Sequence, residues 1–372
     1  MAGRRRRRGD GADMDRTTVL KWIGTACILL LGVTGLYLLV AEDPYGGEPV
    51  HVARIVSGPA KPDRQDAGIR PSITRDGQPE PLPSGHRVAP ADIVIRDPMS
   101  MAQAEPGRDL DPALTEPGPH GPLPRIGPDG ETSARAYAAP VSADALGKSR
   151  IAILVGGMGL SASATEKAIA ELPPGVTLAF APYGRDLADL ARRARRAGHE
   201  IMLQMPMEPY DFPDNDPGPQ TLLTGLDAAQ NRDRLHWSMA RFGGYVGVTN
   251  YMGARFSATE GGMRAFLQEL SSRGLLYVED GSSQRSLAPQ IGREIGLPTA
   301  AADMVVDVVP RKDDVRRALD ELEALAAREG SAIGFATGLP VTIDAIAEWA
   351  EGLEERGAAL VPVSAAVGVT GS

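Results

Sequence analysis

The stretch Gly198-His-Glu-Ile-Met-Leu-Gln-Met-Pro-Met-Glu-Pro209 decides how the second half of this chain is interpreted. Residues 199–205 form a mostly apolar run bounded by a glycine and a proline, which is typical of a buried β-strand. The basic amphipathic segment 186–196 precedes this strand and predicts a helix. In α/β domains the C-terminal ends of the strands carry the chemistry. We therefore expect Gln204 and Glu208 at the functional edge of such a domain.

From Ser149 onward, apolar runs of strand length alternate with segments of helical spacing. The predicted strands are 151–155, 176–181, 199–205, 245–249, 275–279, 305–309, 332–336 and 359–363. The predicted helices are 163–172, 186–196, 228–242, 260–273, 287–295, 313–328 and 342–356. Continuous apolar strands indicate a parallel sheet buried on both faces. An open doubly wound sheet and a closed barrel both fit, and the number of units favours the barrel.

The N-terminus has the pattern of a membrane anchor. Arg4–Arg8 are five consecutive arginines, and 22–41 is a run of twenty residues without a charge. Such a run is long enough to span a hydrocarbon core of about 30 Å as a helix. It exceeds a typical signal-peptide core and lacks a small-residue cleavage site, so an uncleaved anchor is favoured over a cleaved signal. The charge asymmetry predicts a cytoplasmic N-terminus (1–21), a transmembrane signal anchor (22–41) and a periplasmic remainder.

A proline-rich segment follows the anchor. Of the 31 prolines in the chain, 18 lie between Asp43 and Pro140. This composition predicts a disordered linker over 42–147 and a single folded domain over 148–372. Apolar islands at 88–95 and 135–141 could instead dock on the domain or on a partner, although a solvated linker is the favoured interpretation.

Charge and cysteine content argue against nucleic-acid binding and against a disulfide framework. The formal net charge of −9 argues against nucleic acid as a partner, because binding to phosphates needs a basic face. Cys27 is the only cysteine and lies within the predicted anchor, so no disulfide framework is expected in the domain.

Two loops at the predicted functional edge have open interpretations. The segment Gly156-Gly157-Met158-Gly159-Leu160-Ser161 could cradle a phosphate, but its glycine spacing misses the dinucleotide fingerprint and no Lys-Ser/Thr pair follows. A tight strand-to-helix turn is the favoured interpretation. The loop 206–218 contains Glu208 and three aspartates, which could bind Ca²⁺, but its prolines favour a turn-rich lid.

Other candidate residues follow the next two predicted strands. Asn250, Tyr251 and Arg255 are suited to binding sugar hydroxyls or an oxyanion, with a helix-leading loop as the alternative. The strand that ends at Glu279 is followed by Asp280, and one of these two carboxylates is expected to face the edge. Histidines are scarce: only His199 and His236 occur in 148–372, and neither has a partner at metal-ligand spacing. The domain therefore lacks the parts of a zinc hydrolase and of a serine hydrolase.

Taken together, these segments resemble the divergent polysaccharide deacetylase family (YibQ-type), which is related to the NodB-like carbohydrate esterases. The resemblance covers 149–364. The matching segments are 151–159, 176–183, 198–209, 247–257, 274–283, 301–309, 330–334 and 357–364. It implies a distorted (β/α) barrel of about seven units, of the glycoside hydrolase-deacetylase type, and cell-envelope glycans as substrates.

The chain departs from the family at the positions expected to bind metal. Gly156 and Gly157 replace two aspartates, while Gln204 and Tyr251 replace histidines of the third and fourth motifs. A Gly-His-Pro motif common near the end is replaced by 334–337. The retained residues are Glu208, Asn250, Gly253, Arg255, Phe256 and Asp280. Metal-dependent deacetylation needs a cation to polarise the carbonyl and a carboxylate base.

The combined loss of these ligands predicts that the family's zinc or similar cation is absent and that no metal site remains. We expect a membrane-anchored periplasmic protein that binds envelope glycan or peptidoglycan, or an envelope protein partner, as a degenerate pseudoenzyme. Gly156, Gly157, Gln204, Asn250, Tyr251 and Arg255 are its predicted substrate-binding residues. The alternative is an active hydrolase that removes N-acetyl groups with Glu208 and Asp280 as catalytic residues. A pure protein-binding scaffold is favoured if Glu208, Asn250 and Arg255 prove to be buried in a structural network.

Overall fold

The structure is a computed structural model that describes residues 110–142, 145 and 147–369. These residues belong to one unit of the chain, 90–372. In this part of the chain no helix is long and apolar enough to cross a membrane. The predicted anchor at 22–41 lies outside the described residues and stays a prediction.

A parallel sheet of nine strands forms the centre of the described domain. Its strands are β3 (Ser149–Met158), β4 (Thr177–Phe180), β5 (Ile201–Met207), β6 (Gly247–Met252), β7 (Leu276–Glu279), β8 (Thr299–Ala301), β9 (Met304–Val305), β10 (Ser331–Thr337) and β11 (Ala358–Leu360). The order is β8-β7-β6-β5-β4-β3-β10-β9, and β11 pairs with the first half of β3.

The two ends of this sheet are connected by one short segment. β8 pairs with β7, and β9, only two residues further on, pairs with β10. Between them, Ala302 N donates to Glu279 O at 2.8 Å and Asp303 N donates to Ile333 O at 2.7 Å. The sheet is therefore curled, with helices outside it, which is consistent with a (β/α) barrel.

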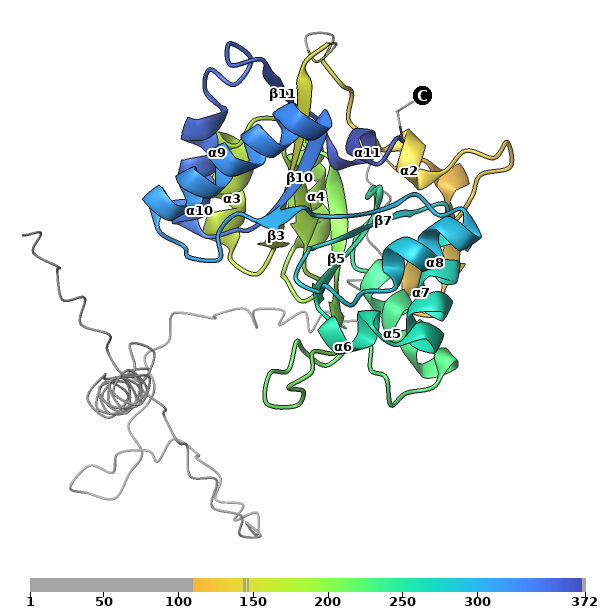
Figure 1. Ribbon diagram of the computed structural model, residues 1–372. Helices are drawn as coiled ribbons and strands as arrows, with labels where there is room; N and C mark the ends of the chain where they lie inside the picture. Colours follow the sequence, from red (N-terminus) through yellow and green to blue (C-terminus); the bar gives the residue numbers. More distant parts are fainter. Residues whose placement is uncertain (1–109, 143–144, 146, 370–372) are drawn as a thin grey trace, which may run out of the picture. The chain divides into compact units, whose positions relative to one another are not determined.

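Helices cover the outer face of the curled sheet on both sides (Figure 1). These helices are α3 (Ala162–Glu171), α4 (Leu187–Arg196), α5 (Ala228–Met239), α6 (Ala254–Ser257), α7 (Glu260–Ser272), α8 (Ala288–Ile295), α9 (Lys312–Glu329) and α10 (Pro340–Ala350). The short helix α11 (Val363–Ala366) instead packs in the inner core. One group is formed by α3, α9 and α10, which pack on each other and on β3 and β10, and another by α5, α7 and α8.

The sheet has two buried faces because alternate residues of each strand point in opposite directions. In β3, Ile151 and Ile153 pack in the outer core with the helices, whereas Ala152 and Leu154 pack in the inner core. The inner core also contains Met202 and other strand residues, and its members are fully or nearly fully buried. Burial of both faces explains why the strands read as continuous apolar runs.

Strand β5 extends two residues beyond its predicted end and includes Pro206. A proline in a central strand normally removes a ladder hydrogen bond. Here β4 pairs with β5 only as far as Leu203, and the Pro206 carbonyl accepts a bond from Leu222 N at 2.9 Å on the same side. The missing N–H therefore deprives no neighbouring strand of a donor.

Residues 110–142, predicted as part of the disordered linker, are folded. They contain a short 3₁₀ turn (Pro112–Leu114), an antiparallel hairpin of β1 (Thr115–Gly118) and β2 (Gly121–Pro124), and the helix α2 (Ser133–Ala136). Leu114 and Leu123 are 1% and 2% exposed. Docking of these apolar side chains offsets the high proline content, which a two-stranded hairpin tolerates at its edges. The remainder of the predicted linker, 42–109, lies outside the described residues.

The predicted strand 305–309 is largely wrong. Only Met304–Val305 is paired as β9, and Val308 is 78% exposed. The valine-rich run instead forms part of the loop between β9 and α9. The charged residue at the centre of this run, Asp307, was the sign that the run leaves the sheet.

Candidate functional site

Gly156, Gly157 and Gln204 meet at the C-terminal edge of the sheet, as expected. Gln204 is 3% exposed, and its Oε1 accepts a hydrogen bond from Gly157 N at 2.7 Å. A Cβ added at Gly156 would lie 2.6 Å from Gln204 Nε2 and 2.7 Å from Phe335 Cζ. The Gln204 and Phe335 side chains thus occupy the space into which any side chain at position 156 would point.

The Glu208 carboxylate is buried in a local network. It forms an ion pair with Arg255, with 3.1 Å between Arg255 Nη1 and Glu208 Oε1, and it accepts a hydrogen bond from Thr224 N. The Glu208 carbonyl also accepts bonds from Arg255 N and Phe256 N, both at 3.1 Å. Glu208 is 5% exposed, whereas the Arg255 side chain is 48% exposed. This arrangement joins the loop after β5 to α6, and it leaves the arginine facing solvent.

Asn250 and Asp280 form a second, separate network. Asn250 Oδ1 accepts bonds from Asp280 N at 2.9 Å and from Tyr277 Oη at 3.3 Å, and Asn250 Nδ2 donates to Met252 O at 2.7 Å. Asp280 Oδ1 accepts from Ser282 N at 2.9 Å, and burial raises the Asp280 pKa. The partners of Asp280 are different from those of Glu208, so the structure does not join the two predicted catalytic carboxylates.

The turn after β6 needs glycine at position 253. Gly253 has φ +93°, and a Cβ there would lie 2.5 Å from Met207 Cβ. Only glycine combines this conformation with such a close approach. The turn places Arg255 beside Glu208, and Tyr251, at the end of β6 before the turn, is 42% exposed.

Glu279 is a buried carboxylate, and neither it nor Asp280 is open to solvent. Glu279 is 1% exposed, and its Oε1 has no hydrogen-bond partner in the described part of the chain. Burial raises its pKa to about 7, hydrogen bonds from Ser286 and Ser257 oppose this rise, and the Asp280 charge adds to it. Tyr277 of β7 packs in the outer core and Val278 in the inner core, so alternation places Glu279 on the outer side and Asp280 on the inner side. The expectation that one of the two carboxylates faces the edge stays a prediction.

Asp307 is a buried aspartate near the strand ends that the sequence analysis did not single out as a candidate residue. It is 6% exposed, and its Oδ2 accepts bonds from Thr337 N at 2.8 Å and from Thr342 Oγ1 at 3.1 Å, and one from Thr337 Oγ1. Its Oδ1 lacks a partner among the described residues. An aspartate in a run of valines next to a strand end was the signal that could have identified it.

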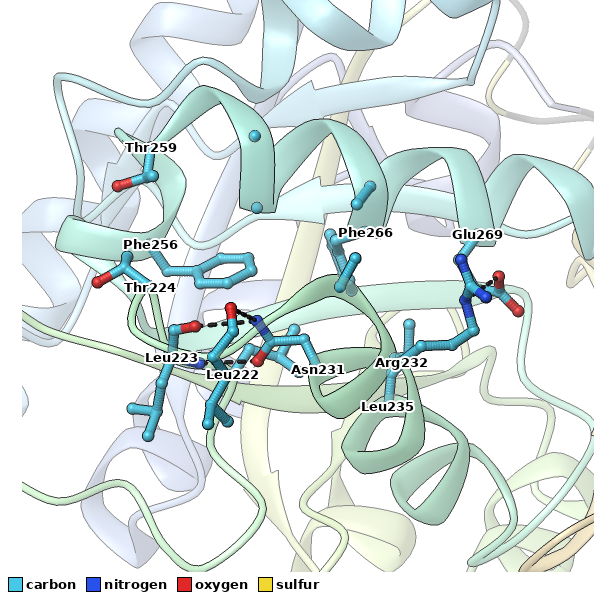
Figure 2. A pocket seen from close by; sticks show the side chains of 15 residues that line it. Leu222, Leu223, Thr224, Asn231, Arg232, Leu235, Phe256, Thr259, Phe266 and Glu269 are labelled. Atoms are coloured by element: carbon cyan, nitrogen blue, oxygen red, sulfur yellow. Dashed lines mark hydrogen bonds and ion pairs between the residues drawn. The ribbon is translucent and has the colours of Figure 1, made fainter.

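A small cavity lies next to the Glu208 network (Figure 2). It has a volume of about 160 Å³ and lies between residues 222–226, α5 and α7. Its polar groups are engaged: Asn231 exchanges hydrogen bonds with the Leu223 backbone at 3.0 and 2.9 Å, and Arg232 pairs with Glu269 at 3.4 Å. Pockets for small molecules usually have volumes of about 300–1,000 Å³. This cavity is therefore too small for a sugar residue together with the sugars linked to it in a glycan.

Comparison with known proteins identifies the family. The family model of the divergent polysaccharide deacetylases matches residues 153–367. The chain belongs to this family.

Its relatives include proteins without an assigned activity. An uncharacterized protein of Agrobacterium tumefaciens C58 is 44% identical, with a TM-score of 0.64 over 66% of this chain and 98% of that one. An uncharacterized Haemophilus influenzae protein is 25% identical over 53% of this chain and 69% of its own length. The Escherichia coli protein YibQ, also uncharacterized, is 22% identical, and the match spans 48% of this chain and 55% of YibQ.

The residues at the centre of this deacetylase-family domain do not fit a divalent cation. Zinc-type cations are held by thiolate, imidazole or carboxylate ligands, and here the central positions hold two glycines and a glutamine amide. Within 110–142, 145 and 147–369, no group of three or more His, Cys, Asp or Glu side chains is placed to hold a metal ion. The loss of the family cation remains a prediction.

Substitution of Gly156 tests whether this centre is filled. Gly156→Ala is expected to destabilise the domain by about 2 kcal/mol, because its Cβ would overlap with Gln204 and Phe335 and overpacking costs about 1–3 kcal/mol. Chemical denaturation monitored by fluorescence measures this change. Gly157→Asn is the matched control: position 157 has φ +77°, which asparagine tolerates, and no atom lies within 4 Å of an added Cβ. Equal stability of the two variants would show that the centre has room for a side chain.

Proposed function

We propose that this domain is a catalytically degenerate member of the divergent polysaccharide deacetylase family that binds cell-envelope carbohydrate at the C-terminal edge of its sheet. The observation that carries the proposal is the contact at Gly156, where Gln204 and Phe335 fill the space needed for a catalytic carboxylate. Without that carboxylate and without metal ligands, the family's chemistry has no general base and no Lewis acid at this centre.

The loops around this edge carry exposed side chains suited to binding. Of the eight large hydrophobic side chains that are exposed in the described residues, five follow the C-terminal ends of strands and a sixth, Tyr251, is the second-last residue of β6. They are Leu160, Tyr210, Tyr251, Val308, Val309 and Leu339. Exposed tyrosine rings offer an apolar face to the C–H groups of a sugar and a hydroxyl to its oxygens. Arg255, held by Glu208, adds a positioned cation beside Tyr251.

A protein partner is the second candidate. It is favoured by the aliphatic members of this rim, Leu160, Val308 and Leu339, whose exposed surface has no hydrogen-bonding group for a sugar. Exposed apolar patches commonly mark protein interaction sites. Glycan binding is preferred because the tyrosines and Arg255 supply both stacking and hydrogen bonds.

The alternative of an active N-acetyl hydrolase requires Glu208 and Asp280 to act together. Their separate networks do not support this, and the ion pair with Arg255 favours a bracing role for Glu208. Acetate release from acetylated chito-oligosaccharide and from peptidoglycan fragments, with metal content measured on the same sample, tests it. We expect no acetate and no stoichiometric metal. Acetate release that depends on bound metal would overturn the proposal of a degenerate site.

We also propose that residues 22–41 anchor the protein in the inner membrane, with the domain in the periplasm. The support is the apolar run and its flanking charges. Digestion of intact and of permeabilised spheroplasts with a protease tests this, because a periplasmic domain is cleaved in both.

Removal of the rim tyrosines is expected to weaken glycan binding. Tyr210→Ala together with Tyr251→Ala should raise Kd for peptidoglycan fragments about 10-fold or more, because an aromatic contact contributes about 0.5–1.5 kcal/mol beyond its buried area. Both side chains are exposed, so the Tm should not change. Isothermal titration calorimetry measures Kd.

Ile126→Ala is the matched control for this experiment. Ile126 is 42% exposed, the same fraction as Tyr251, but it lies in the segment after β2 and not at the strand ends. Its removal should leave Kd unchanged. Full binding by the double tyrosine variant would show that the rim is not the glycan site.

A further inference from the structure

A larger cavity lies between the N-terminal hairpin and the barrel. Its volume is about 700 Å³. One wall is formed by residues 110–124 with Ser133 and Tyr137, and the other by α4 and residues 240–245. The family match begins only at residue 153, so one wall comes from outside the family domain.

The hairpin wall is fixed to the domain by buried and paired groups. Arg273 Nη1 pairs with Glu116 at 3.0 Å and donates to Pro124 O at 2.9 Å. His120 Nε2 lies 2.8 Å from Asp233 Oδ1. Leu114 and Leu123 are nearly fully buried. The cavity is therefore a built feature between two anchored surfaces.

The lining combines apolar surface with positive charge. Leu114, Leu123, Phe242 and Tyr245 line it together with the prolines of the hairpin, as do the arginines of α4 and of the following wall, Arg192, Arg195 and Arg241. Glu116 is the one carboxylate among the lining residues, and it pairs with Arg273. The cavity is thus apolar with a net positive edge.

The arginines are held in place by neighbouring groups. The Arg195 guanidinium lies over the Tyr137 ring at 4.6 Å, and that of Arg241 lies over Trp237 at 5.0 Å. Arg192 Nη1 pairs with Asp189 at 3.1 Å, and Arg241 Nε donates to Pro182 O at 3.1 Å. A guanidinium has five N–H donors, so Arg192 and Arg241 keep donors with which to bind an anion.

We propose that this cavity binds a single-chain amphiphile with an anionic head group of the fatty-acid type. The acyl chain would occupy the apolar part between the hairpin and residues 242–245, with its carboxylate at Arg192 and Arg241. A volume of about 700 Å³ is within the usual range of about 300–1,000 Å³ for ligand pockets. A sugar is a poorer fit, because leucine, proline, alanine, glycine and aromatic residues make up most of the lining and offer its hydroxyls few side-chain hydrogen-bonding groups. This site is independent of the proposed glycan site.

Titration of the full-length protein with octanoate, decanoate and dodecanoate tests the proposal. Each buried methylene contributes a factor of about four in affinity, so each step of two carbons should lower Kd about 10-fold or more. All three are used below their micelle concentrations. Dodecanol, which lacks the charge, should bind more weakly than dodecanoate, and dodecyltrimethylammonium should not bind. Affinity that is independent of chain length, or equal for the cationic amphiphile, would overturn the proposal.

Variants locate the binding within the cavity. Ala188→Phe adds a ring on the α4 wall and should reduce dodecanoate affinity at least 10-fold. Arg192→Gln with Arg241→Gln should remove the difference between dodecanoate and dodecanol. Arg193→Gln is the matched control, since Arg193 lies on the same helix but pairs with Glu166 outside the cavity. The arginine pair tests the site even if Ala188→Phe lowers the Tm. Dodecanoate binding by the double arginine variant with the affinity of the wild type would overturn the proposal.

Discussion

Glu200→Ala is expected to lower the free energy of unfolding by about 4 kcal/mol, because it leaves three buried donors and one part-buried donor without an acceptor. Glu200 is 1% exposed and precedes β5. Its Oε1 accepts from Ser364 N at 3.0 Å and from Thr177 Oγ1 at 3.2 Å. Its Oε2 accepts from Ala139 N at 3.3 Å and from Ser364 Oγ.

These bonds connect four separate parts of the chain at the N-terminal edge of the sheet. Ser364 belongs to α11, Thr177 begins β4, and Ala139 follows α2 in the N-terminal segment. The Thr177 hydroxyl in turn accepts from Val363 N at 3.0 Å. Burial raises the Glu200 pKa, and the hydrogen bonds oppose this rise. Loss of the carboxylate therefore loosens both the C-terminal helix and the N-terminal segment.

Thermal denaturation followed by circular dichroism measures the effect. For a domain of this size about 1 kcal/mol corresponds to about 2–4 °C, so the Tm should fall by about 10 °C. Glu200→Gln keeps the shape and one acceptor oxygen and should lose about half as much. Glu354→Ala, at a position where the side chain is 61% exposed, should leave the Tm unchanged. A Glu200→Ala variant with a Tm near that of the wild type would show that water replaces the lost acceptor.

The sheet and helices could be predicted because their cause is local. Apolar runs such as 151–155 are buried on both faces, and helices such as 260–273 show one apolar face, so composition alone indicates the type of element. The hairpin at 115–124 could not be found in this way. Its prolines and glycines resemble a linker, and its stability comes from Leu123, which packs in the outer core with distant residues, and from the burial of Leu114.

The sequence predicted which residues lie at the candidate site but not which contacts their side chains make. Gln204, Gly156 and Gly157 lie together because parallel strands end at the same edge. That the Glu208 carboxylate pairs with Arg255 and the Asn250 amide binds Asp280 N depends on side-chain directions that sequence spacing does not give. These contacts favour bracing roles, and the predicted catalytic roles of Glu208 and Asp280 stay predictions.

Buried carboxylates were the least predictable residues. Glu200 lies 164 positions from Ser364, which supplies two of its hydrogen bonds. Sequence patterns do not report contacts at such separations. Glu279 follows an apolar run and was expected to be a rim residue or its neighbour, but strand alternation turns it to the helix side, where Ser257 and Ser286 lie.

Glu279→Gln is expected to change the pH dependence of stability and to make the domain more stable at pH 8. The Glu279 pKa is raised from 4.5 to about 7 in the folded protein, mainly by burial. A carboxyl group with a raised pKa is favoured in its neutral form, so its full contribution to stability is present below about pH 4.5. That contribution is lost as the pH rises from 4.5 to 7, because the folded state must then ionise a buried group.

The size of the effect follows from the pKa difference. A shift of one pKa unit corresponds to about 1.4 kcal/mol, so the wild type should lose about 3 kcal/mol between pH 4.5 and pH 8 because of this group. The glutamine variant lacks this loss, since its amide does not ionise. The difference in unfolding free energy between variant and wild type should therefore increase by about 3 kcal/mol over this range. Urea denaturation at pH 4.5, 6 and 8 measures it.

Ser286→Ala provides a control in the opposite direction. The Ser286 hydroxyl stabilises the ionised Glu279 carboxylate by a hydrogen bond, so its removal should raise the Glu279 pKa further and extend the loss of stability to higher pH. Titrating groups that do not interact with Glu279 are common to all three proteins and cancel in the differences, whereas Asp280 is coupled to the Glu279 charge and contributes to the measured change. A glutamine variant whose stability runs parallel to that of the wild type from pH 4.5 to pH 8 would mean that the carboxylate is solvated by water at Oε1. In that case Glu279 Oε1 would be hydrated, and the unfolding free energy of Ser286→Ala would also run parallel to that of the wild type over this pH range.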